Sequence, residues 1–124
     1  MSAFDDVREI VPLQIWSGVV GRSVHGAEAT LSLLTLEPDV NVPEHSHANE
    51  QMGVLIQGSV TFHIGDERKQ LAPGATWVIP AHVPHSVEVG SDGASIVELF
   101  SPPRADWGSL ARLEPGTPAG FGLD

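Results

Sequence analysis

The chain has 124 residues, which is enough for one globular domain and too few for two of ordinary size. Asp and Glu number 16 against 6 Lys and Arg, a formal net charge of −10, so we expect neither nucleic acid nor an anionic membrane surface as a partner. Cysteine is absent, which excludes disulfides and thiolate chemistry. No apolar stretch has a spanning length and the N-terminal residues lack signal-peptide features, so we expect a cytoplasmic protein.

Short apolar runs separated by turn residues dominate the chain. The candidate strands cover residues 10–20, 29–36, 51–56, 59–64, 75–79, 85–89 and 95–100. The separators carry turn chemistry, as at Gly58 and Gly65-Asp66, which is an arrangement typical of hairpins. Several short strands with this spacing predict an all-β sandwich or small barrel.

The two ends of the chain are expected to lie outside the barrel. We assign residues 1–11 to an N-terminal arm, 12–104 to the barrel, and 105–124 to a short helix with a flexible tail. The arm ends in an apolar stretch with no local partner, and Pro12 is tolerated at a sheet edge. We therefore expect a homodimer that forms by sheet extension through the arm.

Four of the six histidines fall in two tight groups. On an extended segment, His45-Ser46-His47 places both imidazoles on one face, where they can share a cation. On its own such a motif is more often a solvated pair or part of a polar loop than a metal site. The second group, His82-Val83-Pro84-His85, precedes a predicted strand and favours the metal interpretation.

These residues resemble the two motifs of the cupin family. The first motif is His-x-His, three or four residues, Glu, six residues and Gly; the corresponding residues are His45-Ser46-His47, Gln51 and Gly58. The second motif is Gly, five residues, Pro-x-Gly, two residues and His; the corresponding residues are Gly74, Pro80-Ala81-His82 and His85. The resemblance implies an all-β double-stranded β-helix, the jelly-roll cupin barrel, with a short C-terminal helix here.

The metal site that the resemblance implies differs from the common pattern at one ligand. Gln51 stands where the motif has Glu, and the adjacent Glu50 is expected to point to the opposite face because side chains alternate along a strand. Some cupins use three histidines and a glutamine. The resemblance therefore implies a metal site formed by His45, His47, Gln51 and His85. The chain departs from the two motifs at three further positions: the motifs have Gly where the chain has Asp39 and His82, and Asn where it has Val89.

A ligand set without charge leaves a divalent ion its full +2 charge. Such an ion is a strong Lewis acid towards a carbonyl, a carboxylate or a bound water. The same set disfavours a ferric state, which benefits from anionic ligands. We expect one divalent ion per chain, and the residue types leave Zn, Ni, Fe, Mn and Co open.

A second cluster follows the last predicted strand. Its functional interpretation makes Glu98 a general acid or base, Phe100 an apolar wall and Arg104 the partner of a substrate carboxylate. The alternative is a solvent-facing Glu and a core Phe. The segment is similar to that of pectin-degradation cupins that open unsaturated monouronates, where an Asp stands in place of Glu98. Trp16, Met52, Trp77 and His82 are candidate pocket walls, with core or rim positions as the alternative.

The leading hypothesis is a metal-dependent enzyme with Lewis-acid isomerase, tautomerase or lyase chemistry. Its expected substrate is a small carboxylated, sugar-acid-like or carbonyl compound. Three alternatives remain open: a non-haem iron dioxygenase, a zinc cupin cyclase, and a non-catalytic cupin that binds a sugar or another effector.

Overall fold

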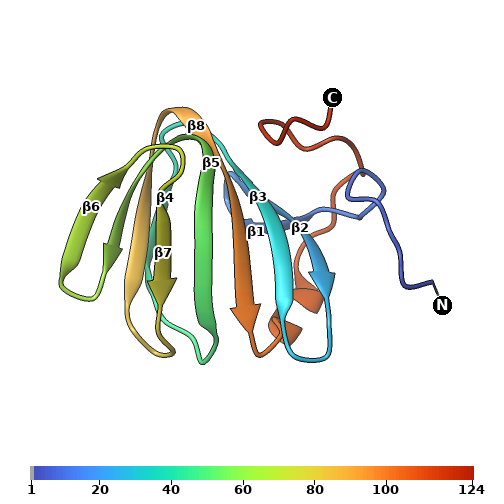
Figure 1. The fold of residues 1–124 in the computed structure, drawn as a ribbon, viewed down its shortest axis with the longest axis horizontal. Helices are drawn as coiled ribbons and strands as arrows, with labels where there is room; N and C mark the ends of the chain where they lie inside the picture. The colour runs from blue at the N-terminus through green and yellow to red at the C-terminus, as the bar shows by residue number, and fades with distance from the viewer. Residues whose placement is uncertain (1) are drawn as a thin grey trace.

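Across residues 2–124, which the computed structural model describes, the chain forms eight strands and one short 3-10 helix (Figure 1). The strands are β1 (Leu13–Trp16), β2 (Val19–His25), β3 (Thr30–Leu36), β4 (Asn41–His45), β5 (Glu50–Ile64), β6 (Glu67–Leu71), β7 (Thr76–Ile79) and β8 (His85–Ser101), and the helix is η1 (Ala105–Ser109). All strand pairs are antiparallel. The all-β jelly-roll prediction is confirmed.

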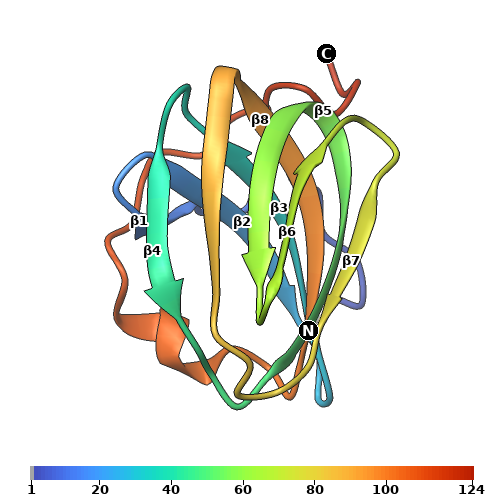
Figure 2. The same cartoon turned by 90° about the vertical axis from the view of Figure 1, so that its left-hand side faces the viewer.

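The long strands β5 and β8 each take part in two facing layers (Figure 2). Residues 50–58 of β5 pair with 94–101 of β8, and this part of the sheet continues through β3, β2 and β1 on one side and β7 on the other. Residues 60–64 of β5 pair with 85–89 of β8, flanked by β4 and β6. The two layers enclose an interior between them.

Gly58 marks the point where β5 passes from one layer to the other. Its φ is +89°, and a Cβ on this residue would lie 2.0 Å from the carbonyl oxygen of Gly93 in β8. Only glycine fits both the positive φ and the close approach of the two backbones. The pairing of the two long strands shifts register on either side of this residue.

The core fills the interior because alternate residues of each strand face inward. Leu55 and Ile79 are completely buried, and Val60 and Ile96 are nearly so. Residues between them in sequence, such as Ile56, are exposed on the outer face. This alternation decides which side chains reach the interior and which remain outside.

The C-terminal region differs from the prediction. The short helix expected within 105–124 is a 3-10 helix that covers Ala105–Ser109. The segment after it packs on the barrel, where Pro118 is fully buried and the Ser95 hydroxyl donates a 2.8 Å hydrogen bond to the Ala119 carbonyl. These contacts hold the segment that was expected to be a flexible tail. In residues 2–124 no helix is long and apolar enough to cross a membrane.

The edge of β1 is covered by this same segment. The Gln14 N–H donates to the Ala111 carbonyl at 2.9 Å, and the Leu113 N–H donates to the Pro12 carbonyl at 2.8 Å. The edge at which the arm was expected to pair with a second chain is therefore occupied by the chain's own C-terminal residues.

Candidate metal centre and its cavity

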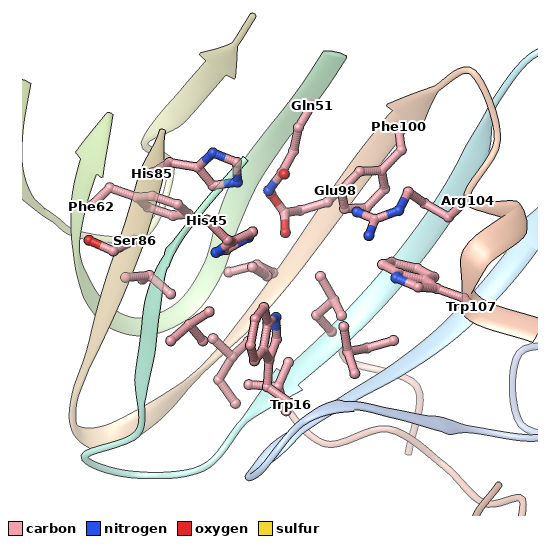
Figure 3. A pocket seen from close by; sticks show the side chains of 17 residues that line it. Trp16, His45, Gln51, Phe62, His85, Ser86, Glu98, Phe100, Arg104 and Trp107 are labelled. Atoms are coloured by element: carbon pink, nitrogen blue, oxygen red, sulfur yellow. The ribbon is translucent and has the colours of Figure 1, made fainter. Parts of the chain in front are cut away.

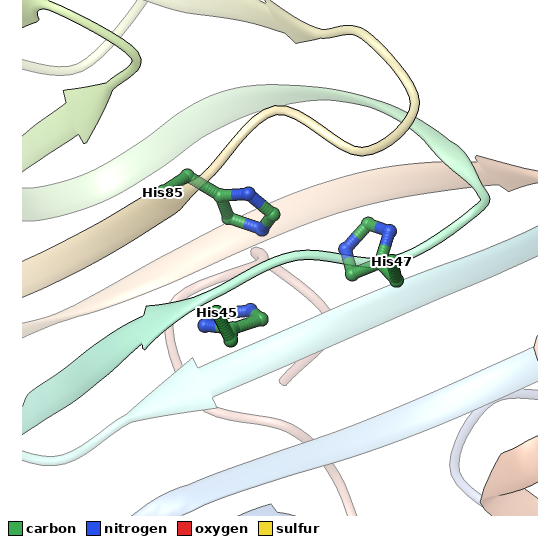
Figure 4. A group of neighbouring side chains, drawn as sticks. All are labelled: His45, His47 and His85. Carbon is green, nitrogen blue, oxygen red and sulfur yellow. The ribbon is translucent and has the colours of Figure 1, made fainter.

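Three histidines from two separate parts of the sequence meet at one place (Figure 4). His45 ends β4, His85 begins β8, and these two residues are cross-strand partners. His47 lies in the loop between β4 and β5. One nitrogen of each ring lies within 4.8 Å of the corresponding nitrogens of the other two.

Each of the three rings is oriented by a backbone carbonyl two residues away. The Nδ1–H groups donate to the carbonyls of Pro43 (2.7 Å, from His45), Asn49 (3.0 Å, from His47) and Val83 (2.9 Å, from His85). A ring whose hydrogen is on Nδ1 offers the lone pair of Nε2 to a metal, and backbone carbonyls commonly hold metal-binding histidines in this way.

The Nε2 of His85 is a buried atom without a hydrogen-bond partner among the described residues. Such an orphaned acceptor is costly unless a cation or proton meets it. Two nitrogens at ~2.1 Å from a shared ion are at most ~4.2 Å apart, so movements of under an ångström bring the three rings to one ion. The histidines therefore fit a metal.

Gln51 of β5 points into the same space and is 5% exposed, whereas Glu50 is exposed on the outer face. The Gln51 Oε1 lies 3.0 Å from the His47 Nε2, and its amide Nε2 donates to Glu98 Oε2. The carboxylate thus fixes which end of the amide faces His47. Because Gln51 Oε1 lies beside the His47 Nε2, Gln51 is a candidate fourth ligand next to the three histidines.

Burial keeps the imidazoles of His47 and His85 in the neutral form that a metal binds. Removal from water lowers the pKa of His47, and the nearby Arg104 charge lowers it further. Burial also lowers the pKa of His85 to about 4. Both rings are therefore deprotonated at neutral pH without the help of a metal.

Glu98 of β8 is a buried carboxyl beside the four candidate ligands. Its Oε2 accepts hydrogen bonds from the Gln51 amide and, at 2.9 Å, from the Trp77 Nε1–H. Burial raises the pKa of Glu98 to about 7, against the opposing effect of these two donors. The sequence singled out Glu98 as a candidate general acid or base. It did not predict the contact with Trp77, which depends on how the strands align.

Arg104 is held in place by Asp106 and by the rings of Phe100 and Trp107, and Figure 3 shows the two rings beside the guanidinium. Its guanidinium carbon lies 5.0 Å from the Phe100 ring centroid and 4.6 Å from that of Trp107. Its Nε and Nη2 donate to the Asp106 carboxylate at 3.0 and 2.9 Å. Within the described residues Nη1 has no hydrogen-bond partner and remains free for a ligand. Trp107 and Asp106 were not predicted, although both follow Arg104 closely in sequence.

One cavity of about 80 Å³ is lined by His45, Gln51, His85, Glu98, Phe100, Arg104 and Trp107. The labelled polar side chains gather on one side in Figure 3, and carbon-only side chains lie opposite them. Trp16 also lines the cavity, with its indole 5.0 Å from the His45 ring. Of the other predicted walls, Met52 and His82 are exposed outside the cavity, and the Trp77 indole lies behind Glu98 rather than on the lining.

The backbone conformation of Asp39 and His82 accounts for two of the departures from the cupin motifs. Both adopt a left-handed backbone, with φ of 63° and 66°, at positions where the cupin motifs have glycine. The His82 N–H donates to the His47 carbonyl at 2.8 Å. His82 therefore supports the ligand loop through its backbone, while its side chain is exposed.

Comparison with known proteins agrees with this geometry. The chain is 32% identical over 71 residues to "H2HPP isomerase" from Bacillus subtilis, a match that spans 56% of this chain and 30% of that protein. KdgF from Halomonas sp. superposes with a TM-score of 0.76 at 22% identity, covering 86% of this chain and 98% of that chain. An RmlC-like cupin from Shewanella frigidimarina gives 0.78 at 20% identity, covering 86% and 96%. Residues 32–100 match the family described as "Cupin domain", and the chain belongs to that family.

Proposed function

We propose that this cupin is a metal-dependent isomerase or tautomerase of a small carboxylated carbonyl compound. The observation that carries the proposal is an uncharged set of three imidazoles and one carboxamide next to a buried carboxyl and a fixed arginine. All of these residues except His47 line one cavity. The name of the Bacillus subtilis relative, an isomerase, supports the same class of reaction.

His45, His47, His85 and Gln51 would hold the ion. A divalent metal with these neutral ligands supplies a Lewis acid for a carbonyl or carboxylate oxygen. The lack of an anionic ligand supports this chemistry over a cycle that passes through a ferric state.

Glu98 would move the proton. Its Oε2 is occupied by the Gln51 and Trp77 donors, and its Oε1 accepts no hydrogen bond from the described residues. A carboxyl whose pKa is about 7 can both take and return a proton near neutral pH. In an isomerisation, Glu98 Oε1 takes a proton from the carbon next to the substrate carbonyl and returns it to another atom of the conjugated system.

Arg104 would bind the carboxylate of the substrate through Nη1. The two hydrogen bonds to Asp106 and the rings of Phe100 and Trp107 fix the guanidinium before the substrate binds. Little side-chain freedom is therefore lost on binding. Arg104 is the one basic side chain among the described residues that line the cavity.

Hydrogen exchange in heavy water tests the proposal. The probe is 4-methyl-2-oxopentanoate, whose C3 protons exchange for deuterium when Glu98 takes one and a deuteron returns. Metal-loaded protein is expected to accelerate the loss of the C3–H signal in proton NMR, while chelator-treated protein and Glu98→Gln are not. The control Glu50→Gln changes an exposed carboxyl beside the ligand Gln51 and should exchange normally. Exchange that survives chelation or Glu98→Gln would contradict the proposal, as would substrate-dependent oxygen uptake without exchange.

A further inference from the structure

We infer that the substrate is a small 2-oxo acid or related carboxylate that carries an apolar group, and not a polyhydroxylated sugar acid. The inference rests on the proposed function for the metal and Arg104 side of the cavity. The inference adds which part of the substrate fills the side of the cavity opposite the metal ligands and Arg104.

The cavity divides chemically into two halves. The polar half is lined by three of the candidate metal ligands, His45, Gln51 and His85, and by Ser86, Glu98, Arg104 and the Trp107 indole. In the opposite half, seven aliphatic side chains from β1, β2, β3, β4 and β8 line the space: Ile15, Val19, Leu34, Leu36, Val42, Val87 and Ile96. Phe62 and Trp16 add aromatic surface to it.

Among the described side chains of the apolar half, the Trp16 indole offers a ligand a single hydrogen-bond donor, its N–H, and the aliphatic side chains offer none. Backbone groups of its strands are committed to the ladders, as where Val42 pairs with Val87 and Leu34 with Ile96. A sugar acid would bury several hydroxyls here, and each hydroxyl without a partner weakens binding by roughly tenfold.

An apolar group gains from the same surface. Each methylene or methyl removed from water strengthens binding by roughly fourfold. With the carboxylate on Arg104 and a carbonyl oxygen at the metal, a group attached beyond the carbonyl extends towards the aliphatic side chains. The cavity of about 80 Å³ suits a small molecule rather than a polymer.

Three probes compare the alternatives on the metal-loaded full chain by isothermal titration calorimetry. Pyruvate has the carboxylate and the carbonyl only, 4-methyl-2-oxopentanoate adds three apolar carbons, and D-galacturonate carries hydroxyls. We expect 4-methyl-2-oxopentanoate to bind roughly 50-fold tighter than pyruvate and at least ~10-fold tighter than D-galacturonate. Galacturonate binding as tightly as 4-methyl-2-oxopentanoate, or no binding of either oxo acid at millimolar concentration, would overturn the inference.

A matched pair of substitutions tests whether the apolar half is responsible for the tighter binding of 4-methyl-2-oxopentanoate than of pyruvate. Val87→Thr places a hydroxyl on the apolar half without changing side-chain shape, and we expect it to reduce the 50-fold ratio to roughly five. Val78→Thr makes the same change on the outer face of β7, where the side chain is 57% exposed, and should leave the ratio intact. An unchanged ratio in Val87→Thr would contradict the inference. If Val87→Thr does not fold, the wild-type comparison still decides. Failure of the protein to bind any metal would instead refute the proposed function.

Discussion

The indole Nε1–H of Trp77 donates a 2.9 Å hydrogen bond to Glu98 Oε2, the oxygen that the Gln51 amide also reaches. Trp77 and Glu98 flank β5 on opposite sides, as cross-strand partners of Gly53. A Cβ at Gly53 would lie 2.5 Å from three atoms of the indole, so only glycine leaves room for the ring. The indole fixes the carboxylate, and the carboxylate orients the amide whose oxygen faces His47.

Removing the indole N–H is expected to weaken metal binding, although Trp77 does not touch the metal site. Trp77→Phe keeps an aromatic ring over Gly53 but leaves Glu98 with one donor, so the Gln51 amide is less well fixed. Groups that orient metal ligands typically contribute 10- to 100-fold to affinity, and we expect a loss of about tenfold. Competition with a chromophoric chelator measures it. The neighbour Val78→Ala, on the outer face, is the control, and equal affinity in Trp77→Phe and wild type would refute the role.

The buried Glu98 makes the metal-free protein less stable at higher pH. Its pKa is raised from 4.5 to about 7, so the folded state holds a proton that the unfolded state has lost. The contribution of Glu98 to the free energy of unfolding is fully present below pH 4.5 and is lost as the pH rises through 7. The free energy of unfolding falls by about 3 kcal/mol over this range. Glu98→Gln has no such titration.

Chemical denaturation of chelator-treated protein at pH 5 and pH 8 checks this. The free energy of unfolding of Glu98→Gln minus that of wild type should increase by up to ~3 kcal/mol between the two conditions. The opposite pH dependence of His85, whose pKa is lowered, cancels in this difference. A difference that stays constant with pH would show that Glu98 titrates normally.

Arg104→Lys is expected to weaken substrate binding and leave metal binding unchanged. A lysine cannot form the two-point contact with Asp106 or stack between Phe100 and Trp107 as a planar guanidinium does. We expect the Kd for 4-methyl-2-oxopentanoate to rise by about tenfold or more. Arg8→Lys provides the matched control, because Arg8 donates the same pair of hydrogen bonds to the Asp6 carboxylate on the surface. Loss of metal in Arg104→Lys would point instead to a structural role.

The homodimer remains a prediction, and the structure changes where its interface is expected. The β1 edge is occupied by residues 111–113. An apolar row instead crosses the outer face of five adjacent strands, formed by the cross-strand neighbours Val24, Leu31, Leu99, Met52 and Val78. With strands ~4.8 Å apart the row is ~19 Å long, and it carries no charge in a chain of net charge −10. A second copy of the same row is its expected partner.

Light scattering on the purified protein tests the interface. Wild type should have twice the 13.1 kDa mass of one chain. Met52→Lys places a charge at the centre of the row and should give a monomer, whereas deletion of residues 1–11 should leave the dimer intact. A monomeric wild type would refute the dimer, and the opposite response of the two variants would return the interface to the arm.

The parts of the site that depend on local spacing could be predicted from the sequence. His45-Ser46-His47 and His85 have motif spacing, and strand alternation places Gln51 inside and Glu50 outside. The same alternation places Met52 outside, so its expected position in the pocket was inconsistent with that of Gln51.

The parts that depend on cross-strand register could not be predicted. The bond between Trp77 and Glu98 requires that both residues align with Gly53, and no single segment of sequence contains that alignment. The C-terminal segment was expected to be free because its Gly and Pro content favours no regular element. Its fixed position depends on hydrogen bonds to the edge of β1, which is nearly a hundred residues away.

Metal content is the most direct test of the central claim, that three histidines and a glutamine form one metal site. The protein is loaded with Zn²⁺ or Co²⁺, dialysed and analysed by inductively coupled plasma mass spectrometry. The account predicts one ion per chain in wild type and in His63→Ala, which removes a partly exposed histidine of β5 that takes no part in the cluster. It predicts less than a tenth of that content in His85→Ala, because the buried Nε2 is lost. Wild type without metal, or His85→Ala with as much as wild type, would contradict the claim.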